Sequence, residues 1–126
     1  MLSVINSAQN QYLKLYRNLK KRDVRDELNL LPLEGVKLVS DALSRGIIPK
    51  LILVREDVDM GKFPFLLPHL GNASIVRVAE KLFDCTAFTD SPQGIIAIAE
   101  KPSYTLTDLF VGTAPLLLVV DAVQDP

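Results

Sequence analysis

Three cations near the start of the chain are spaced so that one face of a helix would carry them all. Lys14, Arg17 and Lys21 stand three and four residues apart, the separation of neighbours along a helical stripe. Residues 1–26 hold six basic and two acidic side chains, whereas the remaining residues hold eight basic and thirteen acidic ones. A basic segment ahead of an acidic body predicts a local contact with a polyanion. The alternative is an ordinary solvated helix face.

A second candidate is the turn formed by Glu34, Gly35, Val36 and Lys37. It follows an apolar segment and opens a helical one, so unpaired backbone N–H groups and a lysine would meet at a helix N-terminus. This arrangement suits a phosphate or an RNA backbone. In the structural alternative, Gly35 only permits the tight turn and Glu34 caps the helix.

The loop of residues 89–94 is a third candidate. Gln93 offers both a hydrogen-bond donor and an acceptor, and Gly94 would let another chain approach closely. The alternative is an ordinary turn before a strand. Together, the three candidates predict a binding surface, suited to a phosphate backbone such as that of RNA, that contains Lys14, Arg17, Lys21, Glu34, Gly35, Lys37, Gln93 and Gly94.

Candidates for catalysis and metal binding are poor. His69 is the single histidine, and the sequence pairs it with no serine or cysteine nucleophile, so a surface position is expected. Cys85 is the single cysteine and is expected to be a small core residue. The two do not form a cluster of metal ligands, and the six scattered glycines match no phosphate-binding loop. We therefore assign no catalytic, cofactor-binding or metal-binding residue.

Length and composition indicate one globular domain. The chain has 126 residues, of which 48% are hydrophobic and 23% are charged. One cysteine suits a reducing compartment. The first residues are too polar for a signal peptide, and apolar runs are shorter than the ~20 residues of a membrane span. We expect a cytoplasmic protein with no membrane contact.

Hydrophobic periodicity predicts a basic N-terminal helix followed by alternating strands and helices. Tyr12, Leu15, Tyr16 and Leu19 would form the buried stripe of that first helix. The alternation predicts an α/β fold whose parallel or mixed sheet carries helices on both faces. The expected strands are residues 30–33, 51–54, 74–78 and 94–99, and the expected helices are residues 10–22, 35–45, 63–70 and 79–84.

Prolines and glycines refine these boundaries. Pro32 has no backbone N–H, so strand 30–33 should lie at a sheet edge. Gly46 should end helix 35–45 in a left-handed turn, with Ile47 covering the last turn. Residues 102–115 are linker-like, with Thr105 or Thr107 capping a one-turn helix.

The last segment resembles the beginning of another domain. Residues 116–120, LLLVV, form a typical buried strand, yet little chain follows them. We therefore divide the chain into a basic helical arm, residues 1–26, a binding domain, residues 27–102, and residues 103–126, which comprise a linker and the first strand of a domain absent here. In an alternative function, the apolar strand makes this chain a non-catalytic dimerisation or assembly module.

Four motifs, in order along nearly the whole chain, resemble the SpoU/TrmH family of RNA ribose 2'-O-methyltransferases. LPLEGVKLVSDAL resembles the family's F-L-V-E-G-x-K-x-V-x-E-A-L signature, and DSPQGIIAIAEKP resembles its Q-G-hydrophobic-A segment. LLLVVDAVQDP resembles the L-V-L-D-x-V-x-D-P run that opens the catalytic domain, and SAQNQYLK resembles the family's start. Two departures are Pro32 within the first signature and Pro92 in place of a histidine before Gln-Gly.

The resemblance implies the N-terminal, substrate-binding domain of such an enzyme. Its fold would be a three-layer α/β/α sandwich with a mixed four-stranded sheet, similar to kink-turn-binding ribosomal proteins. The partner would be ribosomal or transfer RNA, and a homodimer through the catalytic domain is also compatible. S-adenosylmethionine is implied for the full-length protein, with none bound by this fragment. Asp121, Gln124, Asp125 and Pro126 match only the edge of the catalytic motif, so the fragment is expected to be inactive.

Overall fold

A mixed five-stranded sheet forms the centre of the protein in a computed structural model that describes residues 3–69 and 73–124. The strands lie in the order β1-β4-β3-β5-β2. The first three run parallel, whereas β5 runs antiparallel to both of its neighbours. Their bounds are Val4–Ile5 for β1, Leu30–Glu34 for β2, Pro49–Arg55 for β3, Ser74–Val78 for β4 and Ile95–Glu100 for β5.

The four predicted strands are confirmed, and the structure adds a fifth. Strand β1 has only two residues, which is too short for any periodicity to reveal, and Val4 pairs with Arg77 at the sheet edge. Strand β2 forms the opposite edge, as Pro32 predicts. Pro32 lies across from Ile98 of β5, and β2 has no strand on its other side within the described residues.

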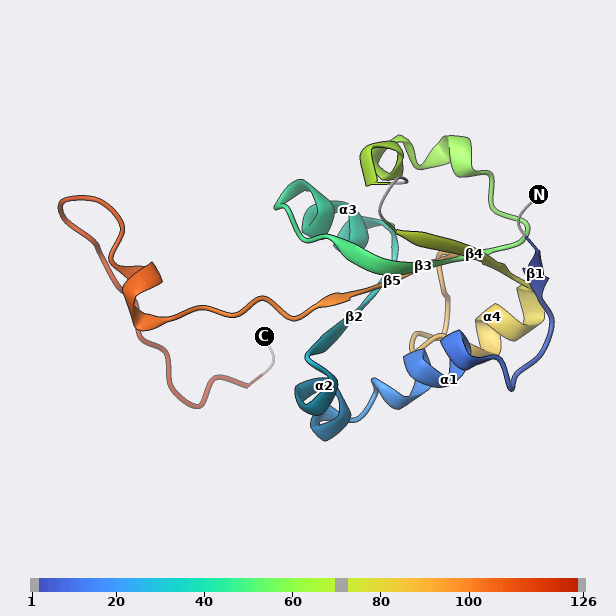
Figure 1. The fold of residues 1–126 in the computed structure, drawn as a ribbon, viewed down its shortest axis with the longest axis horizontal. Coiled ribbons are helices and arrows are strands. Elements are labelled where there is room, and N and C mark those ends of the chain that lie inside the picture. The colour runs from blue at the N-terminus through green and yellow to red at the C-terminus, as the bar shows by residue number, and fades with distance from the viewer. Residues whose placement is uncertain (1–2, 70–72, 125–126) are drawn as a thin grey trace.

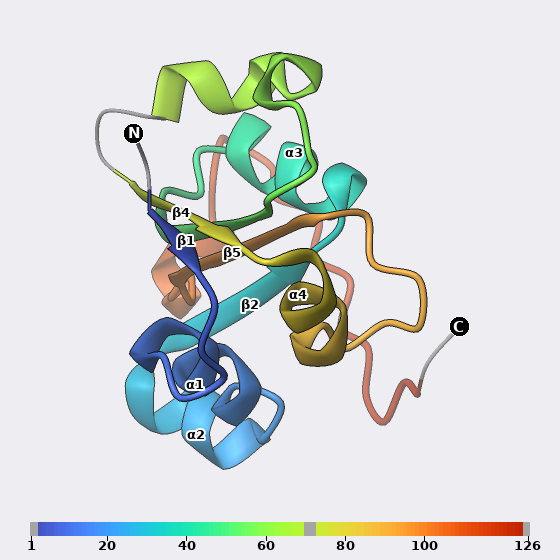
Figure 2. The same ribbon diagram turned by 90° about the vertical axis from the view of Figure 1, so that its right-hand side faces the viewer.

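Helices cover both faces of the sheet, which confirms the three-layer arrangement (Figures 1 and 2). Helix α3 and two 3-10 segments, η1 and η2, cover one face, whereas α1, α2 and α4 lie on the other. Each face has its own apolar core, so the two sides of the central strands are both buried. The bounds are Gln11–Asn18 for α1, Arg22–Leu28 for α2, Val36–Ser44 for α3, Met60–Lys62 for η1, Pro64–His69 for η2 and Glu80–Thr86 for α4.

The predicted helix over residues 10–22 is wrong in its length, because the structure divides this region into α1 and α2. Helix α1 ends at Asn18, and the Arg25 guanidinium donates to the carbonyls of Leu19 and Lys20, at 2.8 Å each. These bonds satisfy carbonyls that the end of α1 leaves unpaired. Lys21 therefore lies outside α1, at the N-cap of α2.

Helix α1 packs against the sheet and contributes large side chains to the core. Leu13, Tyr16 and Leu19 are each at most 1% exposed. Sequence periodicity identified Tyr16 and Leu19 correctly but missed Leu13, and it placed Tyr12 and Leu15 inside although both are half-buried. The basic N-terminal region is thus anchored to the sheet rather than extended from it.

Two predicted helix ends are confirmed. Gly46 has a φ of 81°, and Ile47 donates its N–H to the carbonyl of Ala42 across the end of α3. Thr105 caps η3, Leu106–Leu109, through a reciprocal pair of bonds with Asp108.

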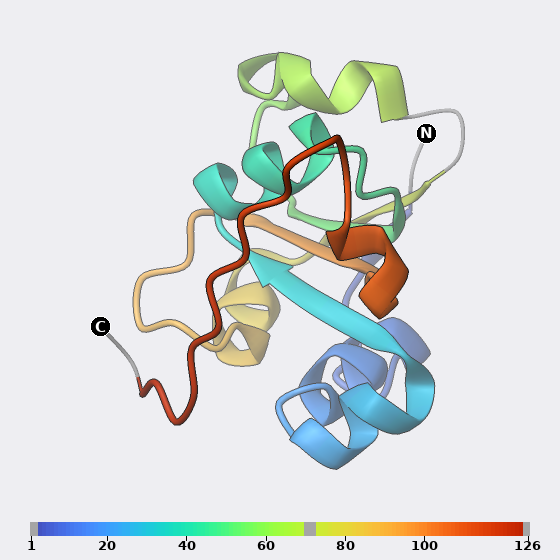
Figure 3. The same cartoon turned by 90° about the vertical axis from the view of Figure 1, so that its left-hand side faces the viewer.

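Residues 101–124 extend away from the sheet and are exposed throughout (Figures 1 and 3). The strand predicted at residues 116–120 is not formed, since no other strand of the described chain pairs with it. Its apolar side chains are 44–96% exposed. Asp125 and Pro126 lie outside the described residues.

The expectation that Cys85 is a core residue is wrong. Helix α4 turns Phe83 and Thr86 toward the sheet, so Cys85 falls on its outer face and is exposed. His69 is half-buried at the end of η2. None of the described helices is both long and apolar enough to cross a membrane.

Candidate functional site

The turn after β2 and the loop before β5 meet at the N-terminus of α3. The Gln93 side-chain oxygen accepts the backbone N–H of Val36 at 2.8 Å, and Gly35 donates its N–H to the carbonyl of Ile95 at 3.0 Å. Gly35 has a φ of 95°, and a Cβ atom there would lie 3.0 Å from the Gln93 oxygen. Glycine thus permits both the left-handed turn and the close approach of Gln93.

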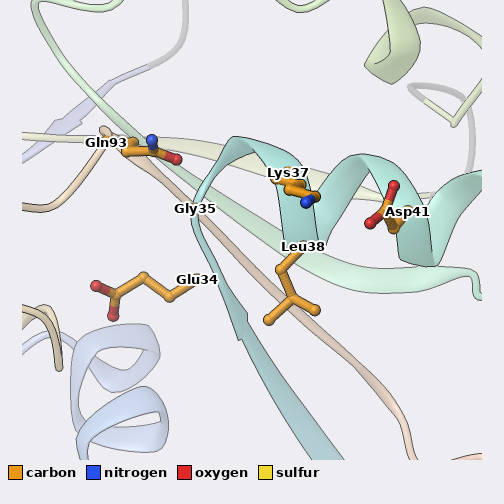
Figure 4. Close-up of a pocket in the computed structure, with 6 residues that line it drawn as sticks. All are labelled: Glu34, Gly35, Lys37, Leu38, Asp41 and Gln93. Atoms are coloured by element: carbon orange, nitrogen blue, oxygen red, sulfur yellow. The ribbon is translucent and has the colours of Figure 1, made fainter.

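Two open clefts flank this turn. One is about 300 Å³ and includes Lys37, Leu38 and Asp41 of α3; the other is about 340 Å³ and includes residues 89–91. Both share Glu34, Gly35 and Gln93. Figure 4 shows Lys37, Leu38 and Asp41 on the α3 side of the turn, with the Glu34 carboxylate directed away from them. The two loops singled out from the sequence therefore form one surface.

The Glu34 carboxylate is held by hydrogen bonds from other residues of the same chain. Its carboxylate accepts the backbone N–H groups of Phe88 at 2.8 Å and Thr89 at 3.1 Å, and also the hydroxyl groups of Tyr16 and Thr89. We call this arrangement the Glu34 clamp. The alternative in which Glu34 caps α3 is wrong, because the carboxylate points toward α1 and the loop after α4.

The clamp sets the ionisation of both its acidic groups. Burial by itself would raise the pKa of Glu34, but the hydrogen bonds from Thr89, Tyr16 and the backbone of Phe88 outweigh it and hold that pKa below its ordinary value. Burial, together with the hydrogen bond to the Glu34 carboxylate and its negative charge, raises the pKa of Tyr16 far above its ordinary value. Tyr16 is therefore a permanent donor and Glu34 a permanent acceptor near neutral pH.

Gly94 makes a close approach within the protein, and not to another chain as the sequence suggested. It is buried with a φ of 82°, and a Cβ atom there would lie 2.5 Å from Cγ2 of Val58. Its carbonyl accepts the N–H of Arg55 at 2.9 Å. Gly94 thus fixes where the 89–94 loop enters β5.

The predicted cations differ in what they contact. Lys14 and Lys21 are exposed, whereas Arg17 is half-buried and donates to the carbonyl of Ala8. Helix α1 itself contains no acidic residue, so its own side chains carry only positive charge. Lys37 is also exposed, but Asp41 lies on the same cleft, which makes the charge beside the Gly35 turn mixed. Among the described residues none of these three lysines forms an ion pair.

Sequence reasoning missed an aromatic residue beside these cations. The Phe88 ring stacks on the Tyr16 ring, with centroids 4.3 Å apart and planes 14° from parallel, and Lys20 Nζ lies 6.0 Å from the Phe88 centroid. Phe88 and Lys20 border a cleft of about 250 Å³ between α1 and the end of α4. Phe88 belongs to an irregular loop with no periodic pattern, so only the fold brings it to α1.

Comparisons with known proteins agree with the motifs. Residues 10–97 match the family model of the MRM3-like substrate binding domain. The chain is 33% identical over 122 residues to the 23S rRNA (guanosine(2553)-2'-O)-methyltransferase RlmP of Bacillus subtilis, covering 97% of this chain and 45% of that protein. It is also 33% identical over 115 residues to the human mitochondrial rRNA methyltransferase 3, covering 86% and 26%. The chain thus spans less than half the length of either relative.

Solved structures show the same fold. The AdoMet-bound rRNA methyltransferase from Sinorhizobium meliloti matches with a TM-score of 0.69 and 26% identity, over 84% of this chain and 39% of that one. A crystallised RNA 2'-O ribose methyltransferase matches with a TM-score of 0.67 and 27% identity, over 82% and 40%. The chain belongs to the MRM3-like substrate binding domain family.

Proposed function

We propose that this chain is the RNA-substrate-binding domain of an S-adenosylmethionine-dependent rRNA ribose 2'-O-methyltransferase. The matched family is a substrate-binding domain, and both curated relatives named above are rRNA methyltransferases. The observation that carries the proposal is the charge of α1. It presents exposed lysine without any acidic residue and borders the cleft at the end of α4. A cationic helix anchored to a rigid sheet is suited to holding phosphates in a fixed position.

Within this proposal, two groups of residues contact RNA differently. Lys14 and Lys21 bind phosphates by charge, and Arg17 assists where its bond to Ala8 leaves donors available. At the Gly35 turn, Lys37 contributes one cation and the Gln93 amide nitrogen contributes donors, since only its oxygen is used by Val36. The mixed charge there favours hydrogen bonding over simple attraction.

Two residues first expected on the RNA surface act indirectly in this proposal. Glu34 has four donors from its own chain, so it positions the loop of residues 88–93 instead of contacting RNA. Gly94 is buried against Val58 and sets where that loop ends. Both are positioning residues whose replacement would disturb the surface without removing a contact to RNA.

The methyl donor belongs, in this proposal, to another part of the whole protein. A bound cofactor is normally mostly enclosed by its site. The clefts beside the Gly35 turn are instead lined by the exposed side chains of Lys37, Asp41 and Asp90. They do not fit S-adenosylmethionine, and the contribution of this chain is to capture and orient RNA.

The exposed tail, residues 101–124, is compatible with two roles, the start of a following domain or an assembly surface. Residues 103–126 would form the linker and first strand of a following catalytic domain, which would cover the exposed apolar residues 116–120. The same exposure favours the alternative of a pure assembly module. Size-exclusion chromatography and RNA binding, measured on the chain and on a variant ending at residue 102, separate the two. Loss of a dimer together with loss of RNA binding would support the assembly module.

A salt titration of RNA affinity tests the main proposal. With a ribosomal-RNA hairpin in a filter-binding assay, the double variant Lys14→Ala/Lys21→Ala should bind more weakly than the unaltered chain. Its slope of log affinity against log salt should fall by about 1.5, since each lost phosphate contact removes roughly 0.7–0.9. The matched control is Lys50→Ala/Lys101→Ala, which removes two lysines paired with Glu100 and Asp26. Equal slopes for both double variants would contradict the proposal.

A further inference from the structure

We propose that the cleft between α1 and the end of α4 holds one unstacked nucleotide of the RNA, with its base on Phe88 and its phosphate on Lys20. This inference rests on the proposed function and adds a subsite to it. The cleft is bordered by Arg17, Lys20 and residues 85–88. It combines two cations with an aromatic face, the combination that binds single-stranded nucleic acid.

The aromatic platform is already formed in the protein without a ligand. Phe88 lies parallel to Tyr16, which is fully buried, and the centroids of their rings are 4.3 Å apart. The Glu34 clamp holds both residues, through the Tyr16 hydroxyl and the Phe88 backbone N–H. Phe88 remains half-buried, so part of it stays open to the cleft. A base that stacked there would bind without the loss of free energy that ordering the two rings would otherwise require.

Lys20 can move from the ring to a phosphate. Its ammonium lies 6.0 Å from the Phe88 centroid, at the outer limit of a cation–π contact. Lys20 is exposed, and within the described residues it forms no ion pair. Arg17, in contrast, is held by the Ala8 carbonyl. Lys20 is therefore the more mobile cation at the mouth of the cleft.

The position of the cleft fits a continuous strand of RNA. Residues 85–88 border it, residues 89–91 border the next cleft, and Gln93 borders both clefts at the Gly35 turn. One short segment therefore leads from the cationic helix α1 to the N-terminus of α3. An RNA that touched both sites would pass directly over Phe88.

The chemistry of the cleft predicts little preference among the four bases. Thr86 is the one hydroxyl side chain in its lining, and it donates to the Leu82 carbonyl at 2.7 Å. The lysine and arginine are donors only. Recognition would then depend on stacking and phosphate charge, which every nucleotide offers.

The test compares two probes on the whole chain, a short oligouridylate and an abasic ribose-phosphate strand of the same length. The unaltered chain should bind the oligouridylate about tenfold more tightly, given the contribution of one stacked base. Phe88→Leu should reduce this ratio to about twofold or less, whereas Phe88→Tyr should keep it. Lys20→Ala should weaken binding of both probes equally. Tyr104→Leu, which removes an aromatic side chain 77% exposed in the tail, is the control and should change nothing.

Several outcomes would overturn the inference. If Phe88→Leu kept the same ratio of oligouridylate to abasic affinity, or if the unaltered chain bound both probes equally, Phe88 would have only a structural role in the core. Thermal unfolding confirms that each variant is folded; if Phe88→Leu is not, Phe88→Met gives the same comparison with a more adaptable side chain. If the unaltered chain binds neither these probes nor the ribosomal hairpin, the proposed function fails as well. Failure of the Phe88 subsite alone would leave binding of the hairpin intact.

Discussion

The Glu34 clamp and two exposed lysines, one within α1 and one just after it, use their charges in different ways. The Glu34 carboxylate accepts four hydrogen bonds from its own chain, so its charge stabilises the fold. Lys14 and Lys20 are exposed and unpaired within the described residues, so their charges are available to a ligand. Charged residues near a candidate site thus fall into two groups: those with partners inside the protein, which stabilise the fold, and those without partners, which can bind a ligand.

The largest effect is expected at Gly94, where the loop of residues 89–94 packs against Val58. Gly94→Ala should destabilise the protein by about 2 kcal/mol more than Gly46→Ala, because its Cβ would overlap Val58 while the backbone strain is shared. The two glycines have φ values of 82° and 81°, and a Cβ at Gly46 would meet nothing within 4 Å. Urea unfolding measures the difference. Equal midpoints for the two variants would mean that the 89–94 loop is not tightly held.

The next effect is expected at the clamp. Glu34→Gln should lower the free energy of unfolding at neutral pH by about 2 kcal/mol, since it weakens hydrogen bonds to a charged acceptor. Because the folded-state pKa of Glu34 lies below its ordinary value, the stability from its charge is present above the ordinary glutamate pKa of about 4.3 and is lost as the pH falls through the lower folded pKa.

The pH dependence separates the charge from simple packing. The difference in unfolding free energy between the unaltered chain and Glu34→Gln should shrink as the pH falls from 6 to about 3. Asp26 and Asp57 also have lowered pKa values, through Lys101 and Arg55 respectively, but both variants share them and their effects cancel in the difference. If the difference in unfolding free energy stayed constant over this range, the negative charge of Glu34 would not contribute to stability.

The smallest effect is expected at the exposed lysines. Lys14→Ala/Lys21→Ala should change the free energy of unfolding by no more than about 0.5 kcal/mol, as is usual for exposed residues. Its loss of RNA affinity would then report lost contacts and not a damaged fold. A destabilisation as large as that of Glu34→Gln would mean that these lysines also serve the fold.

The sequence predicted most of the fold because apolar periodicity marks elements that bury one or both faces. Strands β2 to β5 and helix α3 were found in this way. Strand β1 was missed because two residues carry no periodicity, and the break between α1 and α2 was missed because it depends on Arg25 folding back onto the carbonyls of Leu19 and Lys20. Strand 116–120 was predicted from its apolar composition and its resemblance to a family motif, and no described strand pairs with it.

The candidate site was predicted less completely. The motifs identified both loops, and the structure brings them together through Gln93 and Val36. The inward direction of Glu34 was not predictable, because the partners of its carboxylate come from Tyr16 and from residues 88–89, 18 to 55 positions away. Phe88 was missed for the same reason, since its role depends on which helix lies opposite.

Mapping bound RNA on the protein by NMR tests the central claim most directly. The backbone amide shifts of the chain would be followed while the ribosomal-RNA hairpin is added. Perturbations are expected in residues 14–21, 35–37 and 88–93, and little change is expected at Ile48, Lys50 and Lys101, where β3 begins and β5 ends. Perturbations concentrated at Ile48, Lys50 and Lys101, with residues 88–93 unchanged, would contradict the account.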